Sequence, residues 1–204
     1  QRGIGASTTG ASAFGASVNL STLSTVNAVK PYGEISNSYG SFNTLKNTIK
    51  LGTGLIDGKW NFEGRLSRLS SDGFIDRASS DLNSYYLSGS YLGEKTSIQA
   101  VAFSGHEVTY QAWYGIPLSL LNNNSDSSQT YNPYDYDNEV DNYQQSHYQL
   151  HFTNKPSDKL KLNASLHYTR GKGYFEQYVG TDYNSVMYNG DYVFGKDLFS
   201  YYGF

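Results

Sequence analysis

The densest group of side chains able to do chemistry is acidic. Asp135, Asp137, Glu139 and Asp141 place four carboxylates between positions 135 and 141. Oxygen clusters of this kind bind Ca²⁺, so the segment is a candidate calcium site. It lacks the glycine and the terminal glutamate of an EF-hand loop. A solvated acidic loop is the competing interpretation.

Histidines offer a second candidate. His147 and His151 belong to a predicted strand, in which residues four apart are separated by about 13 Å, so they cannot ligate one metal ion together. His167 on the following predicted strand could lie opposite His147 in one allowed register, which would create a metal pair. The alternative is that all three are polar lining residues on one face of a sheet.

No catalytic arrangement is visible. The chain has no Ser-His-Asp order, phosphate-binding loop or metalloprotease helix, so we expect no enzymatic activity and no cofactor. It has no cysteine, which excludes disulfides and thiolate metal sites. Lys and Arg total 15 against 18 for Asp and Glu, and without an extended basic cluster we expect no nucleic-acid binding.

Aromatic side chains crowd the longest predicted loop, where an exposed ring can stack on a flat or apolar ligand. The candidate ligand-binding residues are Tyr110, Trp113, Tyr114, Tyr131, Tyr134 and Tyr136. Packing of the loop against itself is the competing explanation.

The composition favours strands and turns, with 20 Tyr and 21 Gly against one Met and four Pro. No apolar run reaches about 18 residues, which excludes a transmembrane helix. From Tyr32 onward apolar and polar residues alternate, as Leu45, Ile49 and Leu51 do between positions 44 and 55. A period of two predicts antiparallel strands with one apolar and one polar face.

Three hairpins follow from the turn signals and the alternation. A two-residue turn at Asp57-Gly58 predicts the pairs Leu55 with Trp60, Thr53 with Phe62, and Ile49 with Leu66. A turn at Gly93-Glu94 predicts the pairs Tyr91 with Thr96, Gly89 with Ile98, and Leu87 with Ala100. In the third hairpin the apolar residues fall on even positions in both strands, from Tyr148 to Phe152 in the first and from Leu160 to Leu166 in the second. They share one face only if the loop between the strands has an odd number of residues, so we expect a loop of residues 154–158.

Connection lengths differ between the two ends of the predicted sheet. Tight turns lie near 57, 93 and 156, whereas a short turn near Phe42 and long loops at about 71–84, 106–146 and from 171 onward lie at the other end. This segregation and strands near ten residues are typical of an outer-membrane barrel. Aromatics expected as girdle residues are Trp60 and Tyr91 near the tight turns, and Tyr39, Tyr85, Tyr148 and Tyr168 near the other strand ends. Arg68 and Asn47 are the polar exceptions on the apolar face.

The first thirty residues differ in kind, because small residues dominate there. In order they contain Arg2-Gly3, Phe14-Gly15 and the strand-like run from Val18 through Asn19 to Thr22. This order and spacing resemble the end of the plug domain in TonB-dependent outer-membrane receptors, especially those of the Bacteroidetes type. Arg2, Gly3, Phe14, Gly15, Asn19 and Thr22 carry the plug motif. The stretch from Tyr131 to Gln145, leading into a strand, is similar to the same subgroup.

The resemblance implies an all-β fold in which an antiparallel transmembrane β-barrel of roughly 22 strands encloses a plug. Residues 1–30 would be the end of the plug and its linker to the barrel. Residues 31–204 would be the N-terminal part of the barrel, with about seven strands visible. We therefore expect a fragment that covers the plug end and the first barrel strands, with the coupling box outside it.

By the same resemblance the protein would lie in the Gram-negative outer membrane, in contact with its lipid. It would import a scarce large solute such as a ferric siderophore, haem or cobalamin, using energy from the TonB–ExbB–ExbD system. Two alternatives stay open. One is a soluble secreted β-sandwich that binds carbohydrate through its tyrosines, and the other is a structural or adhesive barrel without transport.

Overall fold

The computed structural model describes residues 30–116, 118–121, 129–178, 186–188 and 191–193. The six residues of the plug motif lie outside these ranges. The strands are β1 (Tyr32–Gly40), β2 (Thr44–Gly52), β3 (Trp60–Ser71), β4 (Ser80–Leu92), β5 (Thr96–Tyr110), β6 (Val140–Ser157), β7 (Leu160–Phe175), β8 (Val186–Tyr188) and β9 (Asp191–Val193). One helical turn, α1 (Leu118–Leu121), interrupts this all-β content.

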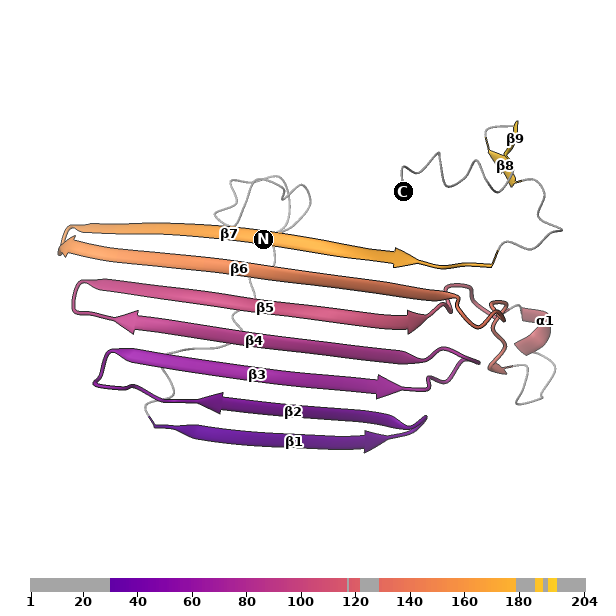
Figure 1. Cartoon of the computed structure of the whole chain (residues 1–204), viewed down its shortest axis with the longest axis horizontal. Helices are drawn as coiled ribbons and strands as arrows, with labels where there is room; N and C mark the ends of the chain where they lie inside the picture. The colour runs from indigo at the N-terminus through magenta and orange to yellow at the C-terminus, as the bar shows by residue number, and fades with distance from the viewer. Residues whose placement is uncertain (1–29, 117, 122–128, 179–185, 189–190, 194–204) are drawn as a thin grey trace.

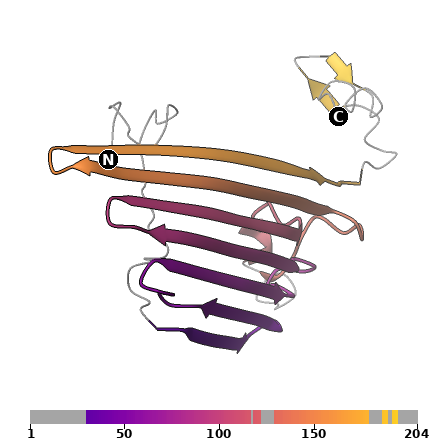
Figure 2. The ribbon, with the colours of Figure 1, turned by 60° about the vertical axis from the view of Figure 1, so that its left-hand side comes forward.

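Strands β1 to β7 form one seven-stranded sheet in chain order, and each strand is antiparallel to the next. Figures 1 and 2 show these strands as a single curved layer. The sheet is open, because β1 and β7 do not pair with each other. Strands β8 and β9 pair separately. The expected antiparallel all-β fold is confirmed.

No helix among the described residues is long and apolar enough to cross a membrane.

The hairpin between β2 and β3 turns at Asp57 and Gly58, as expected. Both residues have positive φ, 51° and 66°, the conformation that this turn requires. The predicted pair of Ile49 with Leu66 is present, and the Thr53 amide donates to the Phe62 carbonyl over 2.9 Å.

The predicted pair of Leu55 with Trp60 is wrong. Ile56 pairs with Trp60 instead, because Gly54 at φ 66° interrupts the ladder just before the turn. One extra residue therefore enters the β2 side of the hairpin.

The register predicted for β4 and β5 is wrong by two residues. Tyr91 pairs with Ile98 rather than Thr96, Gly89 with Ala100, and Leu87 with Ala102. The reason lies in the turn, where the Gly93 amide donates to the Thr96 carbonyl over 2.8 Å and lengthens the loop beyond Gly93-Glu94. A shift of two residues returns every side chain to the same face, so the predicted faces hold.

The hairpin between β6 and β7 keeps the predicted parity. Leu150 pairs with Leu166 and Phe152 with Ala164. The expected loop 154–158 is not present as such, because β6 continues to Ser157. A shift in register between Asn154 and Ser157 takes up the extra residue instead.

The two longest connections, residues 72–79 and 111–139, lie at one end of the sheet, and the connections after β2, β4 and β6 lie at the other end (Figure 1). The short turn of residues 41–43, between β1 and β2, lies at the same end as the two longest connections. The expectation of strands near ten residues is wrong for β5, β6 and β7, which have 15, 18 and 16 residues. Backbone pairing there continues through polar segments in which the apolar alternation has already ended.

The register gives the sheet two unlike faces. The apolar face carries the odd positions of β1, β2 and β4 and the even positions of β3, β5, β6 and β7. Its members Leu51, Phe62, Leu87 and Leu162 are 60%, 47%, 52% and 49% exposed. Among the described residues, Tyr134 is the only buried hydrophobic side chain.

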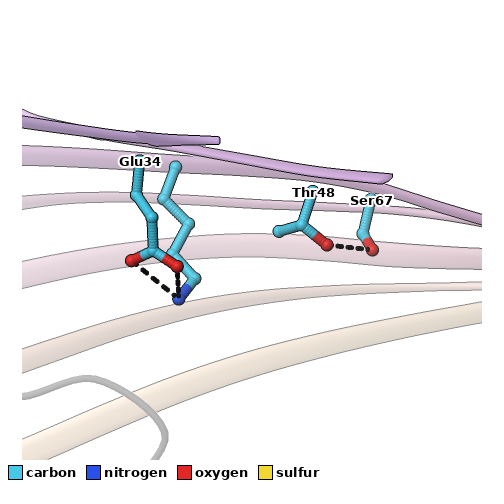
Figure 3. Close-up of polar contacts among 4 residues, drawn as sticks. Glu34, Thr48 and Ser67 are labelled. Atoms are coloured by element: carbon cyan, nitrogen blue, oxygen red, sulfur yellow. Dashed lines mark hydrogen bonds and ion pairs between the residues drawn. The ribbon is translucent and has the colours of Figure 1, made fainter. Parts of the chain in front are cut away.

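The opposite, polar face is held by side-chain contacts between neighbouring strands. Lys50 forms an ion pair with Glu34, Nζ to Oε1 at 3.1 Å, and the Thr48 and Ser67 hydroxyls are 2.9 Å apart. Figure 3 shows both pairs projecting from the same side of the sheet.

Glycine at position 58 should be required by backbone conformation alone. An added Cβ there meets nothing within 4 Å, so Gly58→Ala changes only the cost of positive φ. We expect a loss of about 1 kcal/mol in the free energy of unfolding, measured by urea denaturation. Gly105→Ala is the matched control, because its Cβ also meets nothing and the residue lies within β5. Equal losses in both variants would contradict the assignment.

Candidate functional site

Three segments distant in sequence meet at the long-connection end of the sheet. They are residues 72–79, the described part of 111–139 (111–116, 118–121 and 129–139) and residues 176–178, which together we call the loop cluster. The Asp76 amide donates to the Thr130 carbonyl over 2.7 Å. The Gln111 amide donates to the Glu139 carbonyl over 2.8 Å, and its side-chain Nε2 donates to the Glu176 carbonyl over 2.8 Å.

Arg77 joins the first segment to the second. Its Nε donates to the Tyr134 carbonyl over 2.9 Å, and its Nη2 donates to the Asn132 carbonyl over 3.0 Å. Hydrogen bonds from a charged donor are stronger than neutral ones. Arg77 itself has φ 63°, in the left-handed region that few non-glycine residues adopt, so the contacts hold a strained turn.

Asn132 fixes the same junction from the other side. Its Nδ2 donates to the carbonyls of Asp76 and Gln111, each over 2.9 Å, and its Oδ1 accepts from the Tyr134 amide over 3.2 Å. The side chain is buried. It therefore satisfies three backbone groups where the chain has no regular secondary structure.

Tyr134 lies at the centre of the aromatic side chains. Its ring is stacked with Tyr114 at 5.5 Å between centroids and meets Trp113 edge-on at 6.2 Å. Burial raises the pKa of the Tyr134 phenol above its ordinary value, and the neighbouring Tyr114 phenol adds to the effect. The Tyr134 hydroxyl is thus protonated at neutral pH.

The structure brings most of the predicted ligand-binding aromatics together. Trp113 and Tyr114 pack on Tyr134 but keep 58% and 65% of their surface exposed. The Tyr110 hydroxyl donates to the Tyr136 carbonyl over 2.6 Å. Tyr131 is 41% exposed, on the same 111–139 connection. The loop packs on itself through Tyr134 and also presents the exposed rings of Trp113 and Tyr114, and ligand binding by these rings stays a prediction.

Glu139, one of the four predicted calcium ligands, has partners within the protein. Its carboxylate is buried and accepts from the amides of Tyr136 and Tyr178 over 3.1 and 3.3 Å and from the Tyr110 hydroxyl over 3.4 Å. Asp135 and Asp137 are exposed, and Asp141 belongs to β6. Within the described part of the chain, no three acidic or imidazole side chains are placed to hold a metal ion.

The register does not place His147 opposite His167, the pairing that the predicted metal pair required. His147 lies opposite Thr169, whose hydroxyl is 3.0 Å from His147 Nδ1, and His167 lies opposite Gln149. His147 also stacks on Phe103 at 4.5 Å between centroids. His151 contacts Ser165 and Gln149. These residues act as polar residues of one sheet face, the alternative that the sequence left open.

Sequence reasoning missed Arg77, Gln111 and Asn132. Their partners are backbone carbonyls of distant segments, and no periodicity reports such contacts. The one available signal was the turn-forming pair Asn132-Pro133.

A scan against protein-family models found no match for this chain, and a search of curated proteins found none.

Removing the Arg77 side chain should open the loop cluster locally. Arg77→Ala leaves two carbonyls without their charged donor, a loss on the order of 1.5 to 3 kcal/mol. The open population should rise about tenfold or more, and with it the rate of limited proteolysis within 129–139. Arg65→Ala, at an exposed position of β3, serves as the control. Equal cleavage rates in the two variants would remove Arg77 from this role.

Proposed function

We propose that the sheet is part of a transmembrane β-barrel in the Gram-negative outer membrane, and that this barrel imports a scarce large solute as TonB-dependent receptors do. The observation that carries the proposal is the apolar face. Its large side chains are exposed and, in the described residues, only Tyr134 is a buried hydrophobic. Apolar area of this extent needs a nonaqueous neighbour, and lipid meets that need without a second protein layer.

The dimensions of the apolar face support this neighbour. On β7 the apolar run extends from Leu162 to Tyr168, about 20 Å along the strand, close to the roughly 25 Å apolar band of outer-membrane barrels. Followed strand by strand across the ladder, Leu51 on β2 lies in the same row as Tyr168 on β7. The apolar residues of β7 continue from Tyr168 to Leu162, which is nearer the turn between β6 and β7. Such an oblique edge is expected when strands cross a lipid layer at a tilt.

The polar face has the character of an occupied interior. Among the described residues, Asn61 Oδ1, Glu63 Oε2, Ser88 Oγ and Ser90 Oγ are buried without a hydrogen-bond partner. Asn61 pairs with Ser90 and Glu63 with Ser88, so the four atoms form one patch. Buried polar groups require partners, and a plug inside the barrel would provide them.

The loop cluster supports solute capture on the outer side. Trp113 and Tyr114 offer open rings on a platform that Arg77 and Asn132 fix in place. Rings held in this way bind flat or apolar ligands without the entropic cost of ordering a loose loop. In the proposed cycle, solute released from this platform passes inward when the TonB–ExbB–ExbD system displaces the plug.

Cysteine labelling tests the lipid environment directly, because the chain has no native cysteine. A spin label at Leu166→Cys, on the apolar face, should be relaxed by oxygen dissolved in lipid and shielded from an aqueous nickel complex. A label at His167→Cys, one residue along β7, should show much lower oxygen exposure. Asp158→Cys, in the turn after β6, gives the aqueous reference.

Nickel access at position 166 equal to that at position 158 would contradict a lipid-facing sheet. Shielding from both reagents would instead indicate a second protein layer, as in the sandwich alternative, and would equally overturn the proposal.

Uptake measurements test transport. Cells lacking the full-length protein should lose uptake of one among labelled ferric siderophores, haem and cobalamin, and a protonophore should abolish that uptake in complemented cells. Trp113→Ala with Tyr114→Ala should raise the KM for uptake roughly tenfold with little change in maximal rate. Tyr39→Ala, an exposed aromatic outside the loop cluster, is the control. If cells without the protein take up all of these solutes normally, or if the protonophore does not reduce uptake, the proposed transport function is wrong.

A further inference from the structure

Four buried oxygen atoms on the polar face of β3 and β4 have no hydrogen-bond partner within the described part of the chain. They are Asn61 Oδ1, Glu63 Oε2, Ser88 Oγ and Ser90 Oγ. Their side chains are 0%, 7%, 6% and 3% exposed, in that order. Because Asn61 pairs with Ser90 and Glu63 with Ser88, the four atoms come from two adjacent rows of one face, and we call them the oxygen patch.

Two hydrogen bonds determine which ends of these side chains are left without a partner. Asn61 Nδ2 donates to the Gly54 carbonyl over 3.2 Å, so the amide oxygen is the unpartnered end. The Tyr32 hydroxyl donates to Glu63 Oε1 over 3.5 Å, which leaves Oε2. Tyr32 reaches the carboxylate across Gly52, where an added Cβ would overlap the Tyr32 ring. The amide and the carboxylate are therefore held in place with one oxygen of each unsatisfied.

The negative charge of Glu63 is not balanced by a cation among the described residues. Arg65 lies on the same face two residues along β3, but it is exposed and forms no ion pair with any described residue. Lys50, opposite Arg65, pairs with Glu34 instead (Figure 3). A buried charge is normally paired or coordinates a metal ion, so the oxygen patch needs a positive partner.

The oxygen patch offers oxygen ligands alone, from one carboxylate, one amide and two hydroxyls. Hard cations such as Ca²⁺ and Mg²⁺ bind this kind of set, whereas transition metals prefer imidazole or thiolate ligands. Ca²⁺ accepts roughly six to eight oxygens in flexible geometry, while Mg²⁺ demands a nearly ideal octahedron. Ligands whose positions are set by two strands therefore suit Ca²⁺ better.

The spacing of the oxygen patch fits a single ion. Directly opposite residues of antiparallel strands have Cβ atoms about 5 Å apart, and residues two apart along one strand are separated by about 7 Å. Oxygens on opposite sides of a Ca²⁺ ion lie about 5 Å apart, because each is roughly 2.3 to 2.6 Å from the ion. The longer side chains of Asn61 and Glu63 cover the difference along the strand.

We propose that the oxygen patch binds one Ca²⁺ ion, with Glu63 Oε2, Asn61 Oδ1 and the hydroxyls of Ser88 and Ser90 as its ligands. Water, or the backbone of a plug that covers this face, completes the coordination. The set contains one carboxylate, so it differs from a cluster of three acidic or imidazole side chains, which the described residues do not form. The inference goes beyond the proposed transport function and does not require the membrane location.

An ammonium or guanidinium group from another segment is the competing partner. Each serine hydroxyl of the oxygen patch lies beside an acceptor, Ser88 opposite Glu63 and Ser90 opposite Asn61, yet donates to neither. A hydroxyl both donates and accepts hydrogen bonds, so its lone pairs are available to an ion. Four groups that all present lone pairs favour a small cation over a bulky donor.

Equilibrium dialysis of the full-length protein in detergent against radioactive Ca²⁺ tests the proposal. Glu63→Gln removes the only charged ligand, so the affinity of one binding site should fall at least about tenfold. Ser88→Ala combined with Ser90→Ala removes two neutral ligands and should lower the affinity of the same site in the same direction.

Two controls accompany these variants. Glu107→Gln removes an exposed carboxylate from the same face of the sheet on β5. Asp135→Asn with Asp137→Asn removes two exposed carboxylates from the acidic segment at the other end of the sheet. Both controls should leave the site at Glu63 unchanged. Heat-dependent electrophoretic mobility confirms that each variant is folded.

Thermal unfolding distinguishes an ion from a protein partner. In the presence of a chelator the Glu63 charge has no partner, so Glu63→Gln should raise the midpoint of unfolding. Added Ca²⁺ should raise the midpoint of the wild type and leave that of Glu63→Gln unchanged, because a ligand stabilises only the state that binds it. If a lysine or arginine were paired with Glu63, Glu63→Gln would lower the midpoint with or without Ca²⁺, because breaking a buried ion pair destabilises a protein.

Equal calcium affinity in the wild type and Glu63→Gln, or an equal loss in Glu107→Gln, would overturn the inference. A lower midpoint for Glu63→Gln in chelator would assign the oxygen patch to a cationic side chain and would also overturn it. If Glu63→Gln abolishes calcium binding while the spin label at position 166 reports water, the calcium site is supported and only the membrane proposal is wrong.

Discussion

The structure depends on the alternation of side chains along antiparallel strands whose register is locked by backbone hydrogen bonds. Because the side-chain period is two, one uninterrupted ladder from β1 to β7 is enough to sort Leu51, Phe62, Leu87 and Leu162 onto one side. The same ladder sends Glu34, Lys50 and Thr48 to the other. No buried core is needed to separate the apolar side chains from the polar ones. The stability of the sheet then depends on the environment that each face contacts.

The faces could be predicted from the sequence, but the registers only in part. Asp57-Gly58 is a specific turn signal and set Ile49 opposite Leu66 correctly. Gly93-Glu94 is a weaker signal, and the two-residue error there left the faces intact because the error was even. The lengths of β5 to β7 were missed, since Ser104, Gln144 and Arg170 do not alternate with apolar neighbours yet pair through their backbones.

The candidate sites show the same division. Arg68 and Asn47 were visible in the sequence as polar exceptions, but their position opposite each other is a property of register and required the structure. The aromatic loop was visible from composition. Its anchoring by Arg77 and Asn132 was not, because a side chain that serves a distant carbonyl leaves no local pattern.

The open borders of the sheet have a consequence for assembly. In the described residues β1 and β7 are each bonded on one side only, which leaves a line of amides and carbonyls along each outermost strand. In oil every such group costs several kcal/mol, whereas water satisfies it. A sheet of this kind can enter a bilayer only when both of its edge strands are paired with further strands. Strand pairing must therefore precede or accompany insertion.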